Sequence, residues 1–269
     1  MAKKTDEYRA QLRLLASPKE LEAFLKSHSG LPGPRGNLEL AHAFAQVGPP
    51  ELVWRFARLE AAAAPENTPE VFLAFAGVMG LARLALEGDH GADAMLRRRA
   101  SDSRWRVREA VATAAQLLGD QAPAHFARFT AALAKGNSLE QRAAVAAVAE
   151  PRLLEGARIK AARALLDAVT RRLARAPKPL GPDERVLRQA LAYAWSVVVA
   201  ADAPGGKPVM ERWLESADPD IVWLMRENLE KKRLLRADPA WCARWADTLR
   251  AQPRRRKASA RGLTSAATD

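Results

Sequence analysis

The chain has 269 residues, 48% of them hydrophobic and only 6% aromatic, and it carries a formal net charge of +12. Its single cysteine, Cys242, excludes an intramolecular disulfide and any metal cluster built on several cysteines. The charged amino terminus does not resemble a signal peptide, and we see no run of about 18 apolar residues, so we expect a cytoplasmic protein with no membrane partner. The positive charge favours acidic partners, namely nucleic acid, anionic lipid or an acidic protein.

Helix signals dominate the first 90 residues. Ser17-Pro18-Lys19-Glu20 has the form of a capping box with proline at the first helical position, and it predicts a helix that ends near residue 29. The segment 31–36 contains two prolines and two glycines, so it is expected to be a loop. Further helices are predicted to begin at Asn37, Pro49-Pro50 and Thr68-Pro69.

Helical periodicity continues to residue 250. Val107, Val111, Ala114 and Leu118 are spaced 4, 3 and 4 apart, which places them on one face of a helix. Further helices are expected from Ser138 and over residues 155–176, 183–202, 208–216, 219–235 and 239–250. The β-prone segment 196–201 continues a helical pattern, so a buried helix is favoured over a strand there.

A local pattern occurs twice and decides the architecture. The segments 102–111 and 220–229 each have Asp, then Trp three residues later, then Arg-Glu at six and seven. The segment 138–150 is a weaker copy that lacks the Asp. About a dozen helices recurring at roughly 35–45 residues per pair predict an α-solenoid.

The pattern around Asp102 resembles the second helix of a HEAT repeat. The resemblance implies an all-α, right-handed solenoid of stacked antiparallel helix pairs, with divergent pairs over residues 1–90 and HEAT-like repeats over 91–250. Residues six apart on a helix do not face each other, so Asp and Arg of the pattern must find partners outside their own turn. In HEAT proteins such residues bond between adjacent repeats. The residues to which the resemblance assigns this structural role are Asp102, Arg108, Asp220 and Arg226. The basic segment 251–269 is predicted to be a disordered tail.

Signals for catalysis and metal binding are scarce. None of the four histidines is spaced i, i+4 from another, and Asp89, His90 and Asp93 fall in a predicted turn. Cys242, beside two tryptophans, is expected to be a small buried hydrophobe, and no phosphate-binding or dinucleotide fingerprint occurs. In the 31–36 loop, Arg35 could bind an anion, although bonding to nearby carbonyls is favoured. We therefore predict no catalytic residue, no metal and no cofactor.

Basic residues supply the main signal for a partner. Six arginines lie between positions 97 and 108 against one acid, and a second group follows residue 230. If the turns of successive repeats align, these groups form a stripe that suits a phosphate backbone. The alternative is a solvated face, with cations near helix carboxyl ends. The residues predicted to bind a protein or nucleic-acid partner are Arg97, Arg98, Arg99, Arg104, Arg106, Lys231, Lys232 and Arg233.

Parts of the chain are also similar to the HEAT-like alkylpurine DNA glycosylases, through an all-helical basic body with Trp and Arg at repeat starts. That family uses an aromatic cleft and an Asp four residues after a Trp. Here no Trp-x-x-x-Asp occurs, whereas Trp105 and Trp223 are followed at that spacing by Glu109 and Glu227. The sequence therefore predicts a non-enzymatic HEAT-repeat scaffold that binds a protein or nucleic acid on a concave, partly basic face. The alternative is a DNA-binding relative of these glycosylases, acting in base-excision repair.

Overall fold

A computed structural model describes residues 2–251. Within this range the chain is all α-helical and contains no strand, and its fifteen α-helices are joined by short connections. The predicted all-α fold class is thus confirmed. The predicted tail lies outside the described residues, apart from Ala251, which ends the last helix.

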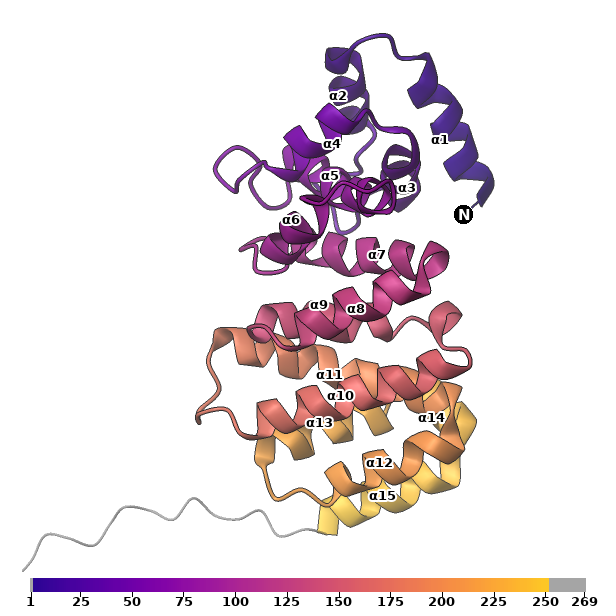
Figure 1. Ribbon diagram of the computed structural model, residues 1–269. Helices are drawn as coiled ribbons and strands as arrows, with labels where there is room; N and C mark the ends of the chain where they lie inside the picture. Colours follow the sequence, from indigo (N-terminus) through magenta and orange to yellow (C-terminus); the bar gives the residue numbers. More distant parts are fainter. Residues whose placement is uncertain (1, 252–269) are drawn as a thin grey trace, which may run out of the picture.

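The first six helices form the N-terminal part of the molecule, drawn in indigo and purple in Figure 1. They are α1 (Ala2–Leu14), α2 (Pro18–Ser27), α3 (Leu38–Val47), α4 (Pro50–Ala57), α5 (Pro69–Leu86) and α6 (Ala92–Arg99). The predicted capping box is present, because Ser17 accepts a hydrogen bond from the Glu20 amide while the Glu20 side chain accepts one from the Ser17 amide. Asn37 caps α3 as predicted, and residues 31–36 form no helix.

The remaining helices build the rest of the stack. They are α7 (Trp105–Gln121), α8 (Pro123–Ala134), α9 (Ser138–Val148), the 3-10 turn η1 (Pro151–Leu153), α10 (Ala157–Ala174), α11 (Pro182–Ala201), α12 (Ala203–Leu214), α13 (Pro219–Leu229), α14 (Lys232–Ala237) and α15 (Pro239–Ala251). The β-prone segment 196–201 is helical as predicted, and Ser196, Val197, Val198 and Val199 are buried in α11. The cap of α9 is Asn137, one residue before the Ser138 that begins the helix.

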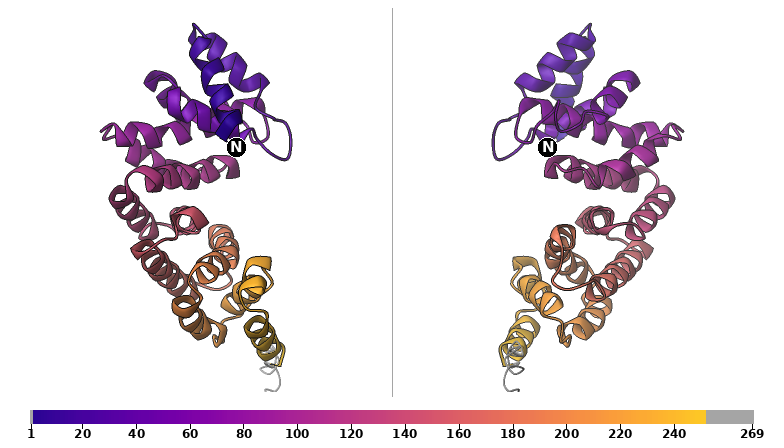
Figure 2. Two further views of the ribbon diagram at one scale, coloured as in Figure 1. Left: turned by 90° about the vertical axis from the view of Figure 1, so that its right-hand side faces the viewer. Right: turned by 90° about the vertical axis from the view of Figure 1, so that its left-hand side faces the viewer.

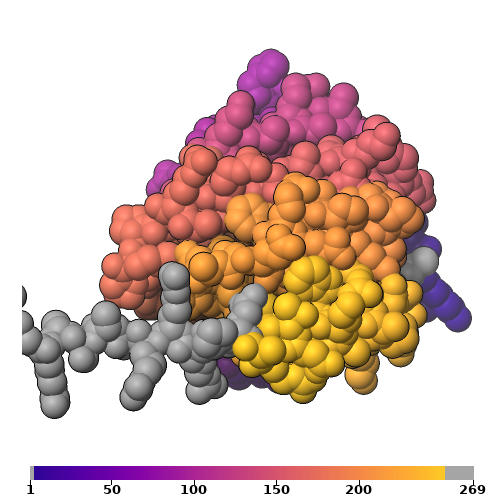
Figure 3. Space-filling view, turned by 90° about the horizontal axis from the view of Figure 1, so that it is seen from below, coloured from indigo at the N-terminus to yellow at the C-terminus, as the bar shows by residue number. Residues whose placement is uncertain are grey.

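Alternate helices pack side by side along the whole stack. Helices α5, α7, α9, α11, α13 and α15 form one continuous row, each in contact with the next. Helices α8, α10 and α12 form a second layer that packs against this row. Figure 2 shows that the stack follows an arc, and Figure 3 shows the yellow surface of α15 at its C-terminal end. This arrangement is an α-solenoid, as predicted.

The segment 219–235 is two helices instead of the one predicted. Helix α13 ends at Leu229, and α14 begins at Lys232. Leu229 and Leu234 are both buried, and both helices contact α11. A continuous helix would place residues five apart on different faces. The break therefore lets both leucines reach the core.

Helix α5 is the central helix of the N-terminal part. It contacts α2, α3, α4, α6 and α7, and thirteen of its eighteen residues are buried. Gly77 and Gly80 face α4, and a Cβ on Gly77 would lie 2.5 Å from the Ala57 amide nitrogen. Glycine is therefore required for this close approach. By length and hydropathy α5 could span a membrane, with a mean hydropathy of 1.5, and 72% of that window is buried inside the fold.

Candidate functional site: a groove along α7, α9 and α11

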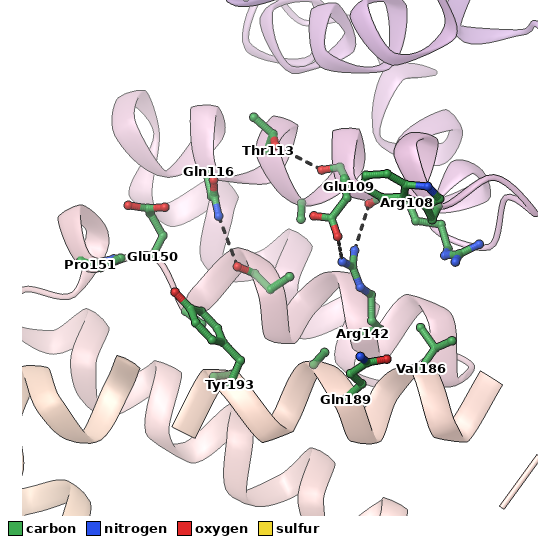
Figure 4. A pocket seen from close by; sticks show the side chains of 16 residues that line it. Arg108, Glu109, Thr113, Gln116, Arg142, Glu150, Pro151, Val186, Gln189 and Tyr193 are labelled. Carbon is green, nitrogen blue, oxygen red and sulfur yellow. Dashed lines mark hydrogen bonds and ion pairs between the residues drawn. The ribbon is translucent and has the colours of Figure 1, made fainter. Parts of the chain in front are cut away.

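A groove of about 600 Å³ runs across three consecutive helices of the continuous row (Figure 4). We call it the α7–α11 groove. Helix α7 forms one side, α11 forms the other, and α9 lies between them. The lining residues used below are Trp105, Arg108, Glu109, Arg142 and Tyr193. Its volume lies in the range of ordinary ligand sites.

Two exposed aromatic rings lie in this groove. Trp105, the first residue of α7, and Tyr193, on α11, are each 47% exposed. Each carries a guanidinium over its ring, Arg106 at 4.5 Å from the Trp105 centroid and Arg233 at 4.7 Å from that of Tyr193. A cation over an aromatic ring is attracted to it, and both of these rings remain about half exposed. The groove therefore offers two positioned aromatic surfaces.

The charged groups that line the groove are Arg108 and Glu109 on α7, Arg142 on α9, and Glu150 just after α9, which pairs with Arg152 at 3.1 Å. Arg142 of α9 reaches across to α7. There it forms an ion pair with Glu109 and donates a hydrogen bond to the Arg108 carbonyl at 3.3 Å. Arg108 itself donates to the backbone carbonyls of Asp102 and Ser103, at 2.7 and 2.8 Å. Burial, followed by the charge of Arg142, lowers the pKa of Arg108 below its usual range.

Arg108 is the cation of this groove that lacks an acidic partner. Among residues 2–251, no carboxylate lies within ion-pairing distance of its guanidinium. Burial and the nearby charge of Arg142 oppose its ionised form more than the charges of Asp102, Asp183 and Glu109 favour it, and a bound anion would stabilise that form. The groove can therefore accept negative charge at this point.

A smaller side chamber of about 270 Å³ adjoins the groove. The two cavities share Trp105, Glu109 and Thr113. The other walls of the side chamber come from α5, the 31–36 loop and the start of α3, and they include Phe72, Phe75, Arg35 and Leu38. Arg106 holds that loop in place, because its Nη2 donates to the Gly33 carbonyl at 2.8 Å. Glu109 thus lies at the boundary between a polar groove and a largely apolar chamber.

Three of the predicted partner-binding arginines are buried. Arg99, Arg104 and Arg106 are 3%, 3% and 7% exposed. Arg99 and Arg104 both bind Asp102, at 3.1 and 2.8 Å. Arg104 also donates to the Leu59 and Ala64 carbonyls, so it ties the start of α7 to the segment between α4 and α5. The guanidinium of Arg106 pairs with Glu66 at 2.7 Å.

This cluster of buried charges lowers the pKa of Asp102. Burial disfavours the ionised carboxylate, and hydrogen bonds from the Arg104 side chain and backbone outweigh that cost, with help from the charge of Arg99. The pKa of Asp102 therefore lies below its usual range. The arginine surplus at this point serves to a large extent to hold α7 against the preceding helices.

The other predicted partner-binding residues lie at the surface. Arg97 and Arg98 pair with Glu140 and Glu60, at 3.0 and 3.3 Å. Lys231 pairs with Glu227 at 3.5 Å, Lys232 is exposed, and Arg233 stacks on Tyr193. None of the eight predicted residues lines the α7–α11 groove, although Arg106 and Arg233 contact its two aromatic rings. Partner binding by the eight residues stays a prediction.

The four residues assigned to repeat joints have different partners. Asp220 binds Lys178 at 2.9 Å and also binds Arg188 of α11. It therefore links α13 to α11, the preceding helix of the row. Arg226 donates to the Leu249 carbonyl of α15 at 3.4 Å. Asp102 binds Arg99 and Arg104, while Arg108 bonds to the backbone of its own segment. Asp220 and Arg226 thus contact other helices of the row, and the inter-repeat role of the four residues stays a prediction.

Three residues of the 89–93 turn and its surroundings, Asp89, Asp93 and His125, have structural partners. Within residues 2–251, no group of three or more His, Cys, Asp or Glu side chains could hold a metal ion. Asp89 accepts a hydrogen bond from Trp54 at 2.8 Å, and Asp93 binds His125 at 2.8 Å. Cys242 is buried, and burial raises the pKa of its thiol.

Comparison with known proteins gives little beyond the fold. No known protein family matches the chain, and no curated protein matches it in sequence. Among solved structures, a designed armadillo repeat protein is similar over 85% of this chain and 98% of its own, with 17% identity and a TM-score of 0.37. The stacked helices of the chain itself define the class of protein as an α-solenoid.

Arg142 and Tyr193 are not among the site residues that the sequence predicts. Arg142 stands 34 residues after Arg108 in the weaker third copy of the repeat, and that offset places it on the next helix of the same row. Equivalent positions of adjacent repeats lie side by side in a solenoid. Following the repeat offset would therefore have found Arg142, whereas nothing comparable marks Tyr193.

Proposed function

We propose that this protein is a non-enzymatic α-solenoid that binds nucleic acid in the α7–α11 groove. The proposal identifies this groove with the concave binding face expected of a solenoid. The observation that carries it is the conjunction, in one groove, of Arg108 without an acidic partner and the exposed rings of Trp105 and Tyr193. Aromatic rings stack on bases and guanidiniums bind phosphates, and proteins that bind single strands combine the two.

The charge of the whole chain supports a polyanionic partner. Residues 251–269 hold five basic residues and one acid, so residues 1–250 keep a net charge of +8. A positive body raises the rate at which an anionic chain reaches the groove. Arg108 and Arg142 would then bind phosphates, while the bases of an unstacked segment lie on Trp105 and Tyr193.

Binding of labelled oligonucleotides tests the proposal. Fluorescence anisotropy with single-stranded and duplex DNA, titrated over several salt concentrations, should show affinity that falls steeply as salt rises. Arg108→Ala should weaken binding by about tenfold and reduce the salt slope by about one, as the loss of one phosphate contact predicts. Arg128→Ala, which removes an exposed arginine of α8 outside the groove, is the matched control.

The basic tail needs its own control in this experiment. Replacing Arg254, Arg255 and Arg256 with alanine lowers the non-specific part of the affinity for oligonucleotides and leaves the groove residues unchanged. The proposal predicts that the effect of Arg108→Ala persists in that background. Absence of binding at low salt, or equal affinity for Arg108→Ala and Arg128→Ala, would overturn it and leave a protein partner as the better candidate.

A second candidate function has its own observation. Glu109 follows the exposed Trp105 by four residues and lies between the groove and the side chamber, with Arg142 beside it. A carboxylate in this position could stabilise positive charge on a sugar while water replaces a departing alkylated base. Incubation with alkylated duplex DNA, followed by chromatography of released bases, tests this. If the unmodified chain releases the base and Glu109→Gln does not, the result would support a glycosylase. If no base is released, that activity is excluded on the substrate used.

A further inference from the structure

A second groove, unrelated to the first, lies between α8 and α10. It has a volume of about 370 Å³, and its floor comes from the end of α9 and from η1. We call it the α8–α10 groove. Its apolar lining includes Phe126, Ala127, Ala131, Leu153, Leu154 and Leu165. None of its lining residues belongs to the α7–α11 groove.

The two walls of this groove run in the same direction. At one end Arg158, near the start of α10, donates to the Gly119 carbonyl at 3.2 Å. Gly119 lies in the last turn of α7, directly before α8. At the other end Arg172 donates to the carbonyl of Ala134, the last residue of α8, at 2.7 Å. The groove is therefore about as long as α8, whose 12 residues span roughly 18 Å.

The lining residues recur with helical spacing on both walls. On α8 they are Phe126, Ala127, Thr130, Ala131 and Ala134, and on α10 they are Ala161, Ala162, Leu165 and Ala168. Each set forms a stripe along one face of its helix. Two parallel helices whose apolar stripes face a common trough match the geometry in which a third helix packs.

The charges at the rim of the groove indicate which charge a helix bound there should carry. Lys135, Arg158 and Arg172 line the groove, and its lining contains no acidic residue. An occupant with acidic flanks would complement these cations, whereas a basic one would be repelled. The chain's own segment beyond residue 251 is arginine-rich and so has the wrong sign.

We propose that the α8–α10 groove binds an amphipathic helix of a partner protein, with an apolar face and acidic flanks. The helix needs about three turns, with apolar residues at i, i+3, i+4 and i+7. This interaction is independent of nucleic-acid binding, because the two grooves share no residue. The protein would thus connect a nucleic acid to an acidic protein partner.

Peptide binding tests this proposal on the full chain. The probe is a fluorescein-labelled peptide of about 14 residues, with leucine at i, i+3, i+4 and i+7 and glutamate on its flanks. Two comparison peptides carry lysine in place of glutamate, or the same residues in scrambled order. We expect anisotropy to report micromolar binding of the glutamate peptide and at least tenfold weaker binding of the other two.

Neighbouring alanines supply a matched pair of variants. Ala131 and Ala132 are both exposed on α8, but only Ala131 lines the groove. Ala131→Glu should weaken the glutamate peptide at least tenfold, and Ala132→Glu should leave its affinity unchanged. Circular dichroism would verify that both variants are folded, and both should bind oligonucleotides like the unmodified chain.

A charge reversal provides a second route to the same conclusion. Lys135→Glu should weaken the glutamate peptide and strengthen the lysine peptide, because Lys135 is exposed at the rim. No peptide binding at millimolar concentration would overturn the proposal. So would equal affinities for the two charge versions, or equal effects of Ala131→Glu and Ala132→Glu. Oligonucleotide binding measured on the same samples keeps these outcomes separate from any failure of the nucleic-acid proposal.

Discussion

Residues 102–109 and 220–227 have the same four residue types at the same spacing, yet the helix begins at a different point in each. Trp105 is the first residue of α7, whereas Trp223 is the fifth residue of α13. Asp102 therefore precedes its helix, while Asp220 lies in the first turn of its own. In the second region the cap is a different residue, Asp218, which accepts from the Asp220 amide at 2.8 Å.

This shift gives the paired residues different surroundings. The side chain of Asp102 is 4% exposed between Arg99 and Arg104, while that of Asp220 is 20% exposed beside Lys178 and Arg188. The tryptophans differ too. Trp105 presents an exposed ring to the groove, whereas Trp223 is half-buried beneath the Arg188 guanidinium, 4.3 Å from its centroid.

The difference shows how one sequence pattern serves two purposes. Around Asp102, a buried charge cluster fixes the start of α7 and leaves the tryptophan free to line a site. Around Asp220, a more exposed ion pair joins adjacent helices, and the tryptophan packs within that joint. The position of the helix start, more than the residue types, decides which of these roles the pattern has.

The largest effect that this comparison predicts is at Arg104. Arg104→Ala leaves the buried Asp102 with one charged partner, Arg99, and also removes the contacts to the Leu59 and Ala64 carbonyls. Breaking a buried ion pair in this way costs about 3–5 kcal/mol. Urea denaturation followed by circular dichroism should therefore show a strongly lowered free energy of unfolding.

The control for Arg104 comes from the second region. Arg188→Ala removes an arginine that is 25% exposed and pairs with Asp220. Its loss of stability should be clearly smaller, because solvent screens such a pair. If the two variants were equally stable, the distinction between a buried anchor and a surface joint would fail.

The tryptophans should separate stability from binding. Trp105→Ala should change the free energy of unfolding little, because the ring is half exposed, but it should weaken oligonucleotide binding by about 1–3 kcal/mol, as the loss of one stacked base predicts. Trp223→Ala should lower stability, by less than the ~3–5 kcal/mol of a fully buried ring, and leave binding unchanged. Denaturation and anisotropy on the same two samples measure both quantities. The reverse assignment of effects would contradict the proposed site.

The sequence predicts much of this fold because helix signals are local. The capping box at Ser17, the proline starts and the helical spacing from Val107 all depend on residues within one or two turns. Helices α1 and α6 lack such a start and are not among the predicted helices, and α8 is not among them either, although it begins with proline, Pro123. Stacking follows from the repeated pattern, because each helix pair needs a neighbour to bury its apolar face.

The site was harder to predict because it depends on contacts far apart in the chain. Arg104 reaches carbonyls 40 and 45 residues earlier, and Arg142 reaches Glu109, 33 residues earlier. Charge density alone does not distinguish an arginine that faces solvent from one that crosses a repeat boundary. The groove residue Tyr193 is likewise marked only by its exposure in the folded structure.

The pH dependence of stability should also differ between the two regions. The pKa of Asp102 is lowered in the folded state, so its contribution is fully present above the unfolded pKa, near 4, and is lost as the pH falls through the folded value. Unfolding free energies between pH 7 and pH 3 should therefore decline less steeply for Asp102→Asn than for the unmodified chain. Asp220 also has a lowered pKa, from hydrogen bonds with Lys178 and Arg188 that outweigh its burial, and Asp220→Asn should flatten the curve less. Equal flattening by the two variants would show that exposure does not govern the difference.

The smallest predicted effect is at Lys178, and salt distinguishes it from the others. Lys178 binds Asp220 at 2.9 Å with a side chain that is 36% exposed, and hydrogen bonds to Asp220 and Asp218 raise its pKa in spite of partial burial. Lys178→Ala should cost at most about 1 kcal/mol in low salt, since exposed ion pairs contribute little. At 1 M salt, where screening acts within about 3 Å, the cost should nearly vanish, while that of Arg104→Ala should remain. Urea titrations at the two salt concentrations measure both costs. If the loss of unfolding free energy in Lys178→Ala were the same at both, packing and not charge would hold α13 at this point.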